Sequence, residues 1–538
     1  MKPILSIFAL VTAGVSLYSL SLQSDAQAAA PASAAGDWPQ WGGSNERNFV
    51  STQTGLPVKM NPGKKKKGGE DIDMSTTENC IWVAKLGSQS YGTCTVAGGQ
   101  IFVGTNNENP RSPKHTGDRG IVMCFDEKSG SFKWQMVSPK LGAGKVSDWE
   151  FLGMCSTPTI VGDKGYVVTN RCEIVCIDTK GLGDGNQGFA DEAKYLAVPD
   201  KDGKLAPIEP DSTDADILWI YDMRKELGVF PHNIASNYAL VVDGKVYVAT
   251  SNGVDWSHSN LPAPQAPSFV CLDAETGAYE AEIPAELQVS ENIMHCNWSS
   301  PSAATVNGKS QIIFAAGDGW VYGLGTAAEK NKIDDEISEL PVKWKYNACP
   351  KDYRVDDKGE KKKYAEYDGP SELISTPVFH DGMVYVLIGQ DPEHGEGVGM
   401  MSCIDPKGEG DLTDKPVWTF KGIERSISSP AVKDGLVYVP DYTGRLFCLD
   451  AKTGKEYWKF DTKGHIWSNP LLVDGKVYLG NEEGELFILA EGKELKELGT
   501  VEFPSPVMGT PVVANGVMYI STHTHLYAFK EGGKPLAP

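Results

Sequence analysis

One segment of the chain concentrates side chains that bind cations. Asp391, Glu393, His394 and Glu396 lie within six residues, and Gly395 allows a tight bend between them. Carboxylate oxygens suit hard cations such as calcium, and imidazole suits transition metals. These four side chains are therefore candidate metal ligands, although a solvated acidic loop would have the same composition.

A second candidate is the pair His523 and His525, which alternate along a predicted strand and could bind a metal from one of its faces. The familiar catalytic signatures are absent from the sequence, including G-x-S-x-G, H-E-x-x-H and phosphate-cradling glycine loops. Gly317-Asp318-Gly319 is interpreted as a hairpin turn. The catalytic residues, if there are any, stay unknown at this level.

The composition argues against two classes of partner. The chain has 71 acidic and 50 basic residues and a formal net charge of -21, so it repels nucleic acid and anionic lipid surfaces. Its one basic cluster, Lys64 to Lys67, lies between glycines and is interpreted as a flexible loop. A hydrophobic fraction of 41% with 22% charged residues is ordinary for a soluble globular protein.

The first 28 residues predict export. Lys2 precedes a mostly apolar stretch from Ile4 to Leu20, and Ala26-Gln27-Ala28 has the small-residue pattern of a cleavage site. A transmembrane anchor is the alternative, which the serines within the stretch disfavour. We expect a signal peptide over 1–28 and a periplasmic or secreted mature protein without membrane insertion.

The chain has eleven cysteines, which is an odd number, so at least one is unpaired within a monomer. The sequence does not show which of the others form disulfides.

A sequence motif recurs along the chain, and it predicts which elements position the candidate residues. Its fullest copy runs from Lys433 to Trp458, and its Cys-Leu-Asp core recurs in eight full or degenerate copies, the last four about 40 residues apart. Each copy predicts four short strands, which we name A to D, joined by Asp-Gly and Thr-Gly turns. A repeat of this length and content is typical of a β-propeller. We therefore predict an all-β, eight-bladed propeller of four-stranded antiparallel blades.

The repeat register explains most of the conspicuous residues as packing. Five tryptophans share the strand-D position, and five cysteines share one strand-C position: Trp134, Trp219, Trp344, Trp418 and Trp458; Cys124, Cys176, Cys271, Cys403 and Cys448. Small and large side chains that recur at fixed repeat positions indicate core packing rather than catalysis. Each buried tryptophan is expected to contribute about 2–3 kcal/mol.

The ends of the repeat array predict how the ring closes. The eighth copy ends at Lys530 without a fourth strand, whereas Asn79 to Leu86 is a strand with Trp82 in the strand-D position. We expect this strand to complete the last blade and leave no open sheet edge. The domains are then a signal peptide over 1–28, an extended leader on the surface over 29–78, the propeller over 79–530, and a C-terminal tail over 531–538.

The repeat, as in Asp434 to Trp458, resembles that of the pyrroloquinoline quinone (PQQ)-binding-like β-propellers, which include quinoprotein alcohol dehydrogenases and an outer-membrane assembly propeller. The segments DWPQWGGSNERN, SNGVDW and GQDPEHGEGVG are similar to those of secreted bacterial PQQ-like repeat proteins. The quinoprotein resemblance implies PQQ and calcium on the propeller axis, with Asn252 as a calcium ligand. The chain lacks the adjacent cysteines and the C-x-x-C-H haem motif of such enzymes, and Asn292 to Trp298 contains no clear counterpart of their catalytic aspartate.

The predicted blades also sort the loops into two faces. B–C turns and D-to-A connections open on one face, and the register assigns eight of the nine histidines to it, with only His380 opposite. The same face receives the long insertions, and loops on a rigid frame are common binding sites. The binding-face candidates are His232, Asn252, Asp255, Trp256, His258, His295, Trp298, Arg425, His465, Trp467 and His523.

Three functional hypotheses follow. The first is an exported, monomeric propeller that binds a small-molecule ligand or an envelope protein through its loop-rich face. The second is a PQQ- and calcium-dependent alcohol or sugar dehydrogenase, and the third is a scaffold in envelope assembly. Whether the protein is an enzyme, and which ligand it takes, are left open by the sequence.

Overall fold

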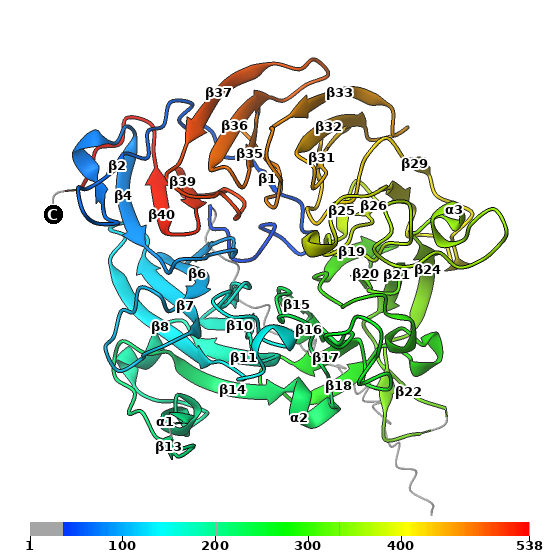
Figure 1. The fold of residues 1–538 in the computed structure, drawn as a ribbon, viewed down its shortest axis with the longest axis horizontal. Coiled ribbons are helices and arrows are strands. Elements are labelled where there is room, and N and C mark those ends of the chain that lie inside the picture. The colour runs from blue at the N-terminus through cyan, green and yellow to red at the C-terminus, as the bar shows by residue number, and fades with distance from the viewer. Residues whose placement is uncertain (1–35, 200–201, 333, 537–538) are drawn as a thin grey trace, which may run out of the picture.

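The computed structural model describes residues 36–199, 202–332 and 334–536, so the predicted signal peptide lies outside the described residues. Eight β-sheets are arranged around a central axis like the blades of a wheel (Figure 1). Blades follow one another in chain order, so the predicted eight-bladed propeller is confirmed. No helix among the described residues is long and apolar enough to span a membrane.

Each blade has four antiparallel strands, ordered from the axis to the rim as A to D. Blades 1 to 4 are β5 (Thr95–Ala97), β6 (Gln100–Asn106), β7 (Arg119–Asp126) and β8 (Phe132–Pro139); β9 (Thr159–Val161), β10 (Lys164–Val168), β11 (Glu173–Asp178) and β14 (Asp216–Asp222); β15 (Leu240–Val242), β16 (Lys245–Ala249), β17 (Phe269–Asp273) and β18 (Tyr279–Glu282); and β19 (Ser302–Val306), β20 (Lys309–Ala315), β21 (Trp320–Gly325) and β24 (Val342–Asn347).

Blades 5 to 8 are β25 (Val378–His380), β26 (Met383–Leu387), β27 (Met401–Ile404) and β29 (Trp418–Phe420); β30 (Ala431–Lys433), β31 (Leu436–Pro440), β32 (Arg445–Asp450) and β33 (Glu456–Asp461); β34 (Leu471–Val473), β35 (Lys476–Gly480), β36 (Glu485–Ala490) and β37 (Glu497–Glu502); and β38 (Val512–Ala514), β39 (Val517–Ser521), β40 (His525–Phe529) and β4 (Cys80–Lys85). The other short elements are β1 (Val50–Ser51), β2 (Lys64–Lys65), β3 (Ile72–Asp73), β12 (Val198–Pro199), β13 (Leu205–Ala206), β22 (Glu329–Lys330), β23 (Ser338–Glu339), β28 (Gly410–Asp411), α1 (Glu192–Tyr195), α2 (Met223–Leu227) and α3 (Lys351–Arg354).

The recurring Cys and Trp lie directly opposite each other within a blade. In blade 6, Tyr438 pairs with Cys448, and Cys448 pairs with Trp458, immediately before a β-bulge. All three side chains are buried. The small thiol leaves room between two large rings, which explains why the position takes Cys, Gly323 or Ala528 in seven blades. Blade 7 has Ile488 there, and Gly499 replaces the tryptophan opposite it. All eleven cysteines are free thiols in the structure.

In five blades the strand-D tryptophan also contacts the next blade, whereas Trp344 donates to Gln311 of its own blade. The Trp418 indole donates a hydrogen bond of 2.9 Å to the carbonyl oxygen of Ala451 in blade 6, and Trp82 donates one of 3.1 Å to that of Glu127 in blade 1. The indole of Trp418 packs on Gly454 so closely that a Cβ there would lie 2.5 Å from it. The repeated Trp and Gly therefore form the contacts between blades.

The ring closes where the sequence predicts. Strand β4 pairs antiparallel with β40, with Trp82 opposite Ala528, and completes blade 8. The N-terminal strand thus supplies the outermost strand of the last blade, next to the C-terminal strands in Figure 1. Because this strand belongs to the last blade and leads directly into the first one, it holds the two ends of the ring together without a covalent link.

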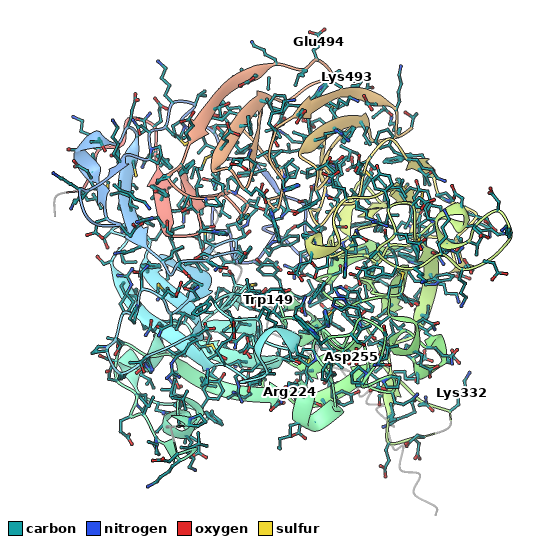
Figure 2. All side chains as sticks on the ribbon, in the orientation of Figure 1. Trp149, Arg224, Asp255, Lys332, Lys493 and Glu494 are labelled. Atoms are coloured by element: carbon teal, nitrogen blue, oxygen red, sulfur yellow. The ribbon has the colours of Figure 1, made fainter. Side chains whose placement is uncertain are left out.

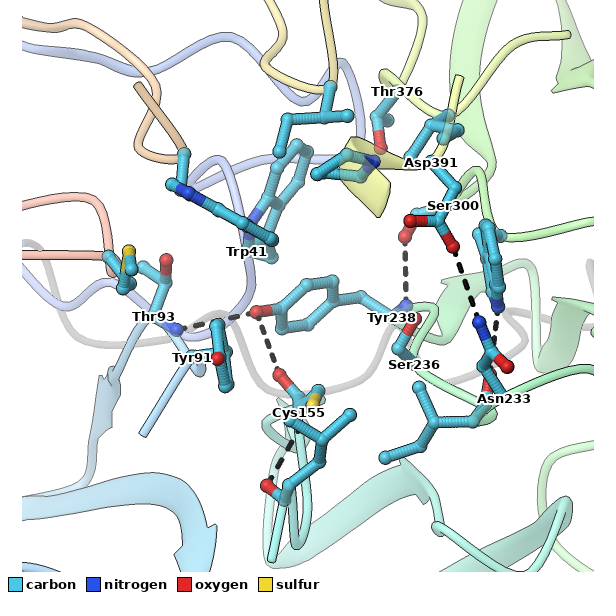
Figure 3. A pocket seen from close by; sticks show the side chains of 18 of the residues that line it. Trp41, Tyr91, Thr93, Cys155, Asn233, Ser236, Tyr238, Ser300, Thr376 and Asp391 are labelled. Atoms are coloured by element: carbon cyan, nitrogen blue, oxygen red, sulfur yellow. Dashed lines mark hydrogen bonds between the residues drawn. The ribbon is translucent and has the colours of Figure 1, made fainter. Parts of the chain in front are cut away.

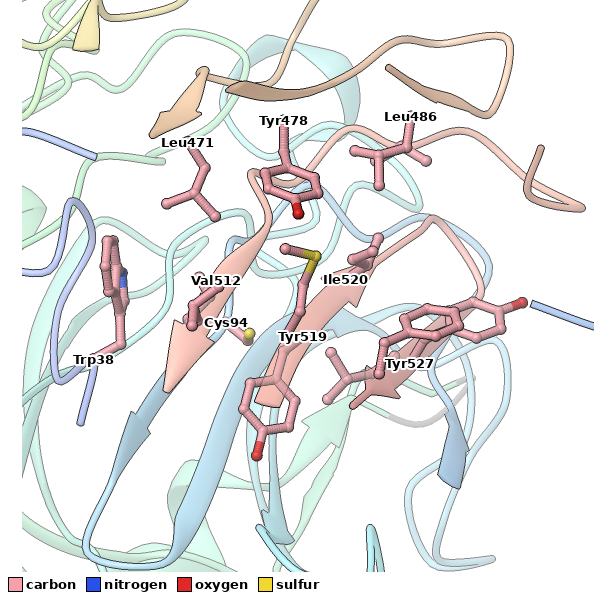
Figure 4. Close-up of a cluster of buried hydrophobic side chains, with 14 of the residues drawn as sticks. Trp38, Cys94, Leu471, Tyr478, Leu486, Val512, Tyr519, Ile520 and Tyr527 are labelled. Atoms are coloured by element: carbon pink, nitrogen blue, oxygen red, sulfur yellow. The ribbon is translucent and has the colours of Figure 1, made fainter. Parts of the chain in front are cut away.

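The expectation that the leader lies on the surface is wrong for its first part. Trp38, Trp41 and Phe49 are buried, and β1 pairs in parallel with β34 of blade 7. Trp38 lies beside the apolar cluster of blades 7 and 8 (Figure 4). The innermost strand of every blade has an unpaired edge facing the axis, and the leader supplies hydrogen-bond partners for several of these edges. The backbone nitrogens of Ile160, Ala303, Phe379 and Leu472 donate to carbonyl oxygens of this segment.

Arg47 anchors the buried part of the leader. Its side chain is fully buried and donates to the carbonyl oxygens of Trp41, Ala239 and Pro301 at 2.8–3.0 Å. Burial lowers the pKa of Arg47 to about 9, which still leaves the guanidinium charged at neutral pH. The leader therefore closes one end of the axial channel.

Candidate functional site: an axial cavity beside a histidine cluster

A ring of polar residues lies around the axis, and in blades 5 to 8 and blade 1 its members directly precede strand A. The backbone nitrogen of Thr376 donates to Ser429 Oγ at 2.8 Å, and that of Ser429 donates to Asn469 Oδ1 at 2.6 Å. The series continues from Asn469 to Thr510 Oγ1 at 2.9 Å and from Thr510 to Thr93 Oγ1 at 3.1 Å. These side chains precede strand A in successive blades, so each one satisfies the backbone of its neighbour and fixes the radius of the channel.

Above this ring lies a cavity of about 460 Å³. The leader and the start of blade 3 form its floor, where the rings of Trp41 and Tyr238 stack at 5.3 Å (Figure 3). The Tyr238 hydroxyl lies 3.3 Å from the Thr93 backbone nitrogen, from which it accepts, and donates to the Cys155 carbonyl oxygen at 3.3 Å. The walls come from loops of the face predicted to bind, and Figure 2 places Trp149 near the centre of the ring. A volume of this size suits a small organic ligand.

The lining is aromatic and carries almost no charge. Among the described residues that line the cavity there are four tryptophans and two tyrosines, and only Asp391 and Glu393 carry charge. Burial raises the pKa of Tyr91 to about 12, so its phenol stays neutral. Hydroxyl and amide groups of the polar ring, together with Gln89, Asn233 and Ser236, provide the remaining polarity. This lining matches a neutral or cationic ligand with an apolar face better than an anionic one.

Four histidines converge next to this cavity. His232 and His295 come from the D-to-A connections that enter blades 3 and 4, whereas His258 and His394 come from B–C turns of blades 3 and 5. The ring centroids of His232 and His295 are 4.3 Å apart, and the ring centroid of His258 lies 5.0 Å from that of each of the other three histidines. Metal-binding atoms of His232, His258 and His295 all lie within 4.8 Å of one another.

Burial keeps the inner imidazoles neutral. It lowers the pKa of His232 and of His295 to about 3 and shifts the pKa of His394 downward as well, and the neighbouring imidazoles add to this effect. His232 Nδ1 donates to the carbonyl oxygen of Val254 at 2.6 Å, which leaves Nε2 with its lone pair. Within the described part of the chain, His232 Nε2, His394 Nε2 and both ring nitrogens of His295 have no hydrogen-bond partner.

Acidic and aromatic groups surround the cluster. His295 Nδ1 lies 3.7 Å from Glu372 Oε1 and 3.9 Å from Asp391 Oδ2. Tyr364 packs against His295 at 5.4 Å and donates to Glu372 at 3.1 Å. Burial raises the pKa of Glu372 well above its usual range. Trp298 contacts the His295 ring at 5.0 Å, and both Trp298 and Asp391 also line the cavity.

The structure places the sequence candidates in different surroundings. Trp298, Trp467, Asp391 and Glu393 line the cavity, and His232, His258, His295 and His394 form the cluster. His465 pairs with Glu482 and stacks on Tyr442 at 4.4 Å, and His523 contacts the cavity residue Tyr91 at 5.1 Å. His525 lies at the start of β40.

The remaining candidates support the loops instead of facing the cavity. Asn252 is buried, its Oδ1 accepts from Phe230 N at 3.0 Å, and its Nδ2 donates to Ala263 O at 2.9 Å. Arg425 is also buried and donates to Ser371 Oγ and to carbonyl oxygens of Glu366, Gly369 and Glu396. Asp255 shapes the turn that carries His258, and Trp256 and Glu396 point into solvent.

Sequence reasoning missed several residues of the site. Trp41 and Tyr238 form the floor of the cavity, Tyr91 lies in its wall, and Tyr364 and Glu372 flank the histidines. The two tryptophans of the leader motif DWPQW were a usable signal, because aromatic residues in a polar leader need a place to pack. Nothing in the sequence around Tyr364 or Glu372 marks them as neighbours of His295.

Comparisons with known proteins agree with the repeat identified in the sequence, but they do not indicate an activity for this chain. Residues 399–495 match the family model described as outer membrane protein assembly factor BamB. No curated protein matches the chain. Similar solved structures include BamB from Moraxella catarrhalis, at 11% identity and a TM-score of 0.49 over 84% of this chain and 97% of that one.

Two dehydrogenases are also among the similar structures. Quinohemoprotein alcohol dehydrogenase from Comamonas testosteroni has 13% identity and a TM-score of 0.42 over 93% of this chain and 81% of that one. A europium-containing methanol dehydrogenase has 12% identity and a TM-score of 0.45 over 92% of this chain and 98% of that one. Similarity at this level transfers neither substrate nor cofactor to this chain.

Proposed function

Because this chain is an eight-bladed β-propeller with PQQ-like repeats, we propose that it is an exported binding module that takes a small ligand into the axial cavity. The observation that carries the proposal is the aromatic, nearly uncharged lining of a cavity of about 460 Å³ on a rigid ring. Export rests on the N-terminal segment 1–28, and the rigid frame holds the lining in place before the ligand arrives.

The lining favours a neutral, polar ligand with an apolar face. Trp149, Trp298 and Trp467 provide flat surfaces in the wall, and Ser300, Thr376 and Ser429 provide hydroxyl groups near the floor. A neutral saccharide combines hydroxyl groups with an apolar ring face and matches both features. Asp391 and Glu393 add a preference for cationic over anionic ligands.

Tryptophan fluorescence tests this proposal directly. The full mature chain is titrated with a panel of neutral oligosaccharides, amino sugars and sugar acids. We expect saturable binding of a neutral or cationic sugar, and at least about fivefold weaker binding in Trp467→Ala, because a stacked aromatic side chain contributes about 1–3 kcal/mol. Trp256→Ala is the matched control, since Trp256 lies on the same face but is 56% exposed and outside the cavity.

Two outcomes would contradict the proposal. Equal affinity in Trp467→Ala and the native chain would place binding outside the cavity. Tighter binding of sugar acids than of their neutral counterparts would contradict the electrostatic argument from Asp391 and Glu393.

The residues of this cavity do not fit PQQ with calcium. PQQ carries three carboxylates, whereas the only charged side chains among the described lining residues are acidic. Asn252, the calcium ligand implied by the resemblance, is fully buried with both side-chain polar atoms occupied by backbone groups. Dehydrogenase activity therefore has no support from this site, and reconstitution with PQQ and calcium should leave neither bound quinone nor dye reduction.

A second candidate function is a scaffold in envelope assembly. The match of residues 399–495 to an outer membrane protein assembly factor favours it. Three described residues have exposed large aromatic side chains, Phe151, Trp256 and Tyr367. All three lie in B–C turns or D-to-A connections, which open on the loop-rich face. Pull-down from an envelope extract with the native chain and a triple alanine variant of these residues tests this function. Prey lost in the variant supports it, and a monomer without prey contradicts it.

A further inference from the structure

We propose that His232, His258, His295 and His394 bind one divalent transition-metal ion, of the zinc or copper class, at the edge of the axial cavity. The four side chains come from separate loops of the ring and are separated by up to 162 positions in the chain (394 minus 232). Their convergence therefore has no local cause in the repeat. The inference goes beyond ligand binding in the cavity and stands on separate residues.

Unpaired nitrogens are the first observation that points to a ligand. His232 and His295 are at most 1% exposed, yet His232 Nε2 and both ring nitrogens of His295 have no hydrogen-bond partner among the described residues. A buried polar atom without a partner costs about 1–3 kcal/mol. Each neutral imidazole has one nitrogen with a lone pair, and a cation that accepts one lone pair from each ring satisfies that nitrogen.

The second observation is the support that fixes the ligand atoms. His232 Nδ1 donates to the Val254 carbonyl oxygen, so the proton sits on Nδ1 and Nε2 faces the other imidazoles. Such a hydrogen bond to the remote nitrogen is the usual outer partner of a metal-bound histidine. Glu372 and Asp391 lie 3.7 and 3.9 Å from His295 Nδ1, where a small shift would give this imidazole the same partner.

The loop that carries His258 is held in an unusual conformation. His258 has a φ of +54°, which is uncommon for a residue other than glycine. Asp255 holds the turn, because its side chain accepts from Ser257 N at 3.0 Å and its carbonyl oxygen accepts from His258 N at 3.0 Å. Strain of this kind persists at functional sites where the surroundings enforce it.

The ligand set selects the class of metal. Neutral imidazoles suit zinc, copper, nickel and iron, whereas calcium and magnesium need oxygen ligands. Two nitrogens bound to one zinc ion at about 2.1 Å in a tetrahedron are about 3.4 Å apart. The binding atoms of His232, His258 and His295 already lie within 4.8 Å of one another, so side-chain movements of about 1 Å bring these three to that spacing. The ring centroid of His394 lies 5.0 Å from that of His258 and 4.9 Å from that of His295, which places it as the fourth ligand.

The position of the cluster connects it to the cavity. Trp298 contacts the rings of both His232 and His295, and Asp391 lies beside His295, while both residues line the cavity. A ligand in the cavity therefore lies next to the metal. This neighbourhood allows a donor atom of the ligand to reach the ion.

Metal titration of the full mature chain, without a histidine tag, tests the proposal. After dialysis against a chelator, the protein is titrated with Zn²⁺ and with Cu²⁺ by calorimetry, and Cu²⁺ is followed by electron paramagnetic resonance. We expect one ion per chain and hyperfine splitting from several imidazole nitrogens. His258→Ala and His394→Ala should each weaken binding by more than about 100-fold, because even outer partners of a metal site contribute about 10- to 100-fold.

These two variants avoid the problem of misfolding. His258 is exposed and His394 is half-buried, so their replacement leaves the packed core intact, and circular dichroism verifies the fold. His465→Ala is the matched control, since His465 lies on the same face but pairs with Glu482. Absence of saturable binding, or equal affinity in the control and both cluster variants, would overturn the proposal. Sugar binding measured on the metal-free chain tests the cavity separately, so the failure of one proposal leaves the other standing.

Discussion

Gly454 provides the sharpest test of how the blades lock together. It closes the turn between β32 and β33 with a φ of +69°, and a Cβ there would lie 2.5 Å from Cε3 and 2.7 Å from Cδ2 of Trp418 in the preceding blade. Gly454→Ala adds left-handed strain of about 1 kcal/mol and overpacking against a buried ring of about 1–3 kcal/mol. We expect a total loss of about 2–4 kcal/mol.

Gly435 is the matched control in the same blade. Its φ is +76°, and no heavy atom lies within 4 Å of the position that a Cβ would take. Gly435→Ala therefore adds only the strain, about 1 kcal/mol. The assay is urea unfolding of each variant, followed by circular dichroism and compared with the native chain by midpoint and slope.

A double-mutant cycle identifies the source of the difference. In a Trp418→Leu background the clash at Gly454 should disappear, and Gly454→Ala should then cost no more than Gly435→Ala. If the two glycine substitutions lower the free energy of unfolding equally in the native background, the packing of Trp418 on Gly454 does not stabilise the contact between blades. An excess cost at Gly454 that persists in the Trp418→Leu background would assign it to the turn instead of the indole.

Three further predictions concern the leader, acid stability and the thiols. Asn48→Ala should lower the free energy of unfolding by about 2–4 kcal/mol, because it leaves the buried N–H and C=O of Val432 without their partner, whereas Gln53→Ala nearer the surface should cost less in the same urea assay. Burial lowers the pKa of His525 to about 4 from 6.5, so folding loses stability as the pH falls from about 6.5 to 4. His525→Gln should reduce this loss by at most about 3 kcal/mol, and an unchanged difference between unfolding midpoints at about pH 7 and about pH 4.5 would contradict this. Under non-reducing conditions the denatured chain should titrate eleven thiols, and the native chain should react slowly because burial raises the pKa of thiols such as Cys448 to about 12.

The fold could be predicted because the sequence signals for its strands and turns are local and recur in each repeat. Each copy contains its own strands, turns and packing residues, so the register of Cys448 and Trp458 defines blade 6 without reference to other blades. The unpaired eighth copy and the extra strand at Trp82 then leave one way to close the ring. The same register assigned the clustered histidines to one face, since B–C turns and D-to-A connections open on the same side in every blade.

The candidate site was predictable only in part. The sequence placed His232, His258, His295 and His394 on one face, but it could not distinguish them from His465 or His523. That distinction depends on how far each loop reaches toward the axis, which is set by insertions outside the repeat. Tyr364 and Glu372 were missed for the same reason, because they lie in a long connection without a register.

The sequence by itself determined the eight-bladed ring, its closure at Trp82 and the face on which polar loops gather, because short-range hydrophobic periodicity and turn chemistry encode these features. Only the tertiary structure decided that the leader closes the channel, that Trp41 and Tyr238 form the cavity floor, and that four imidazoles meet beside it. Contacts between residues so distant in sequence depend on the radius of the assembled ring and the paths of its irregular loops, which no single repeat contains.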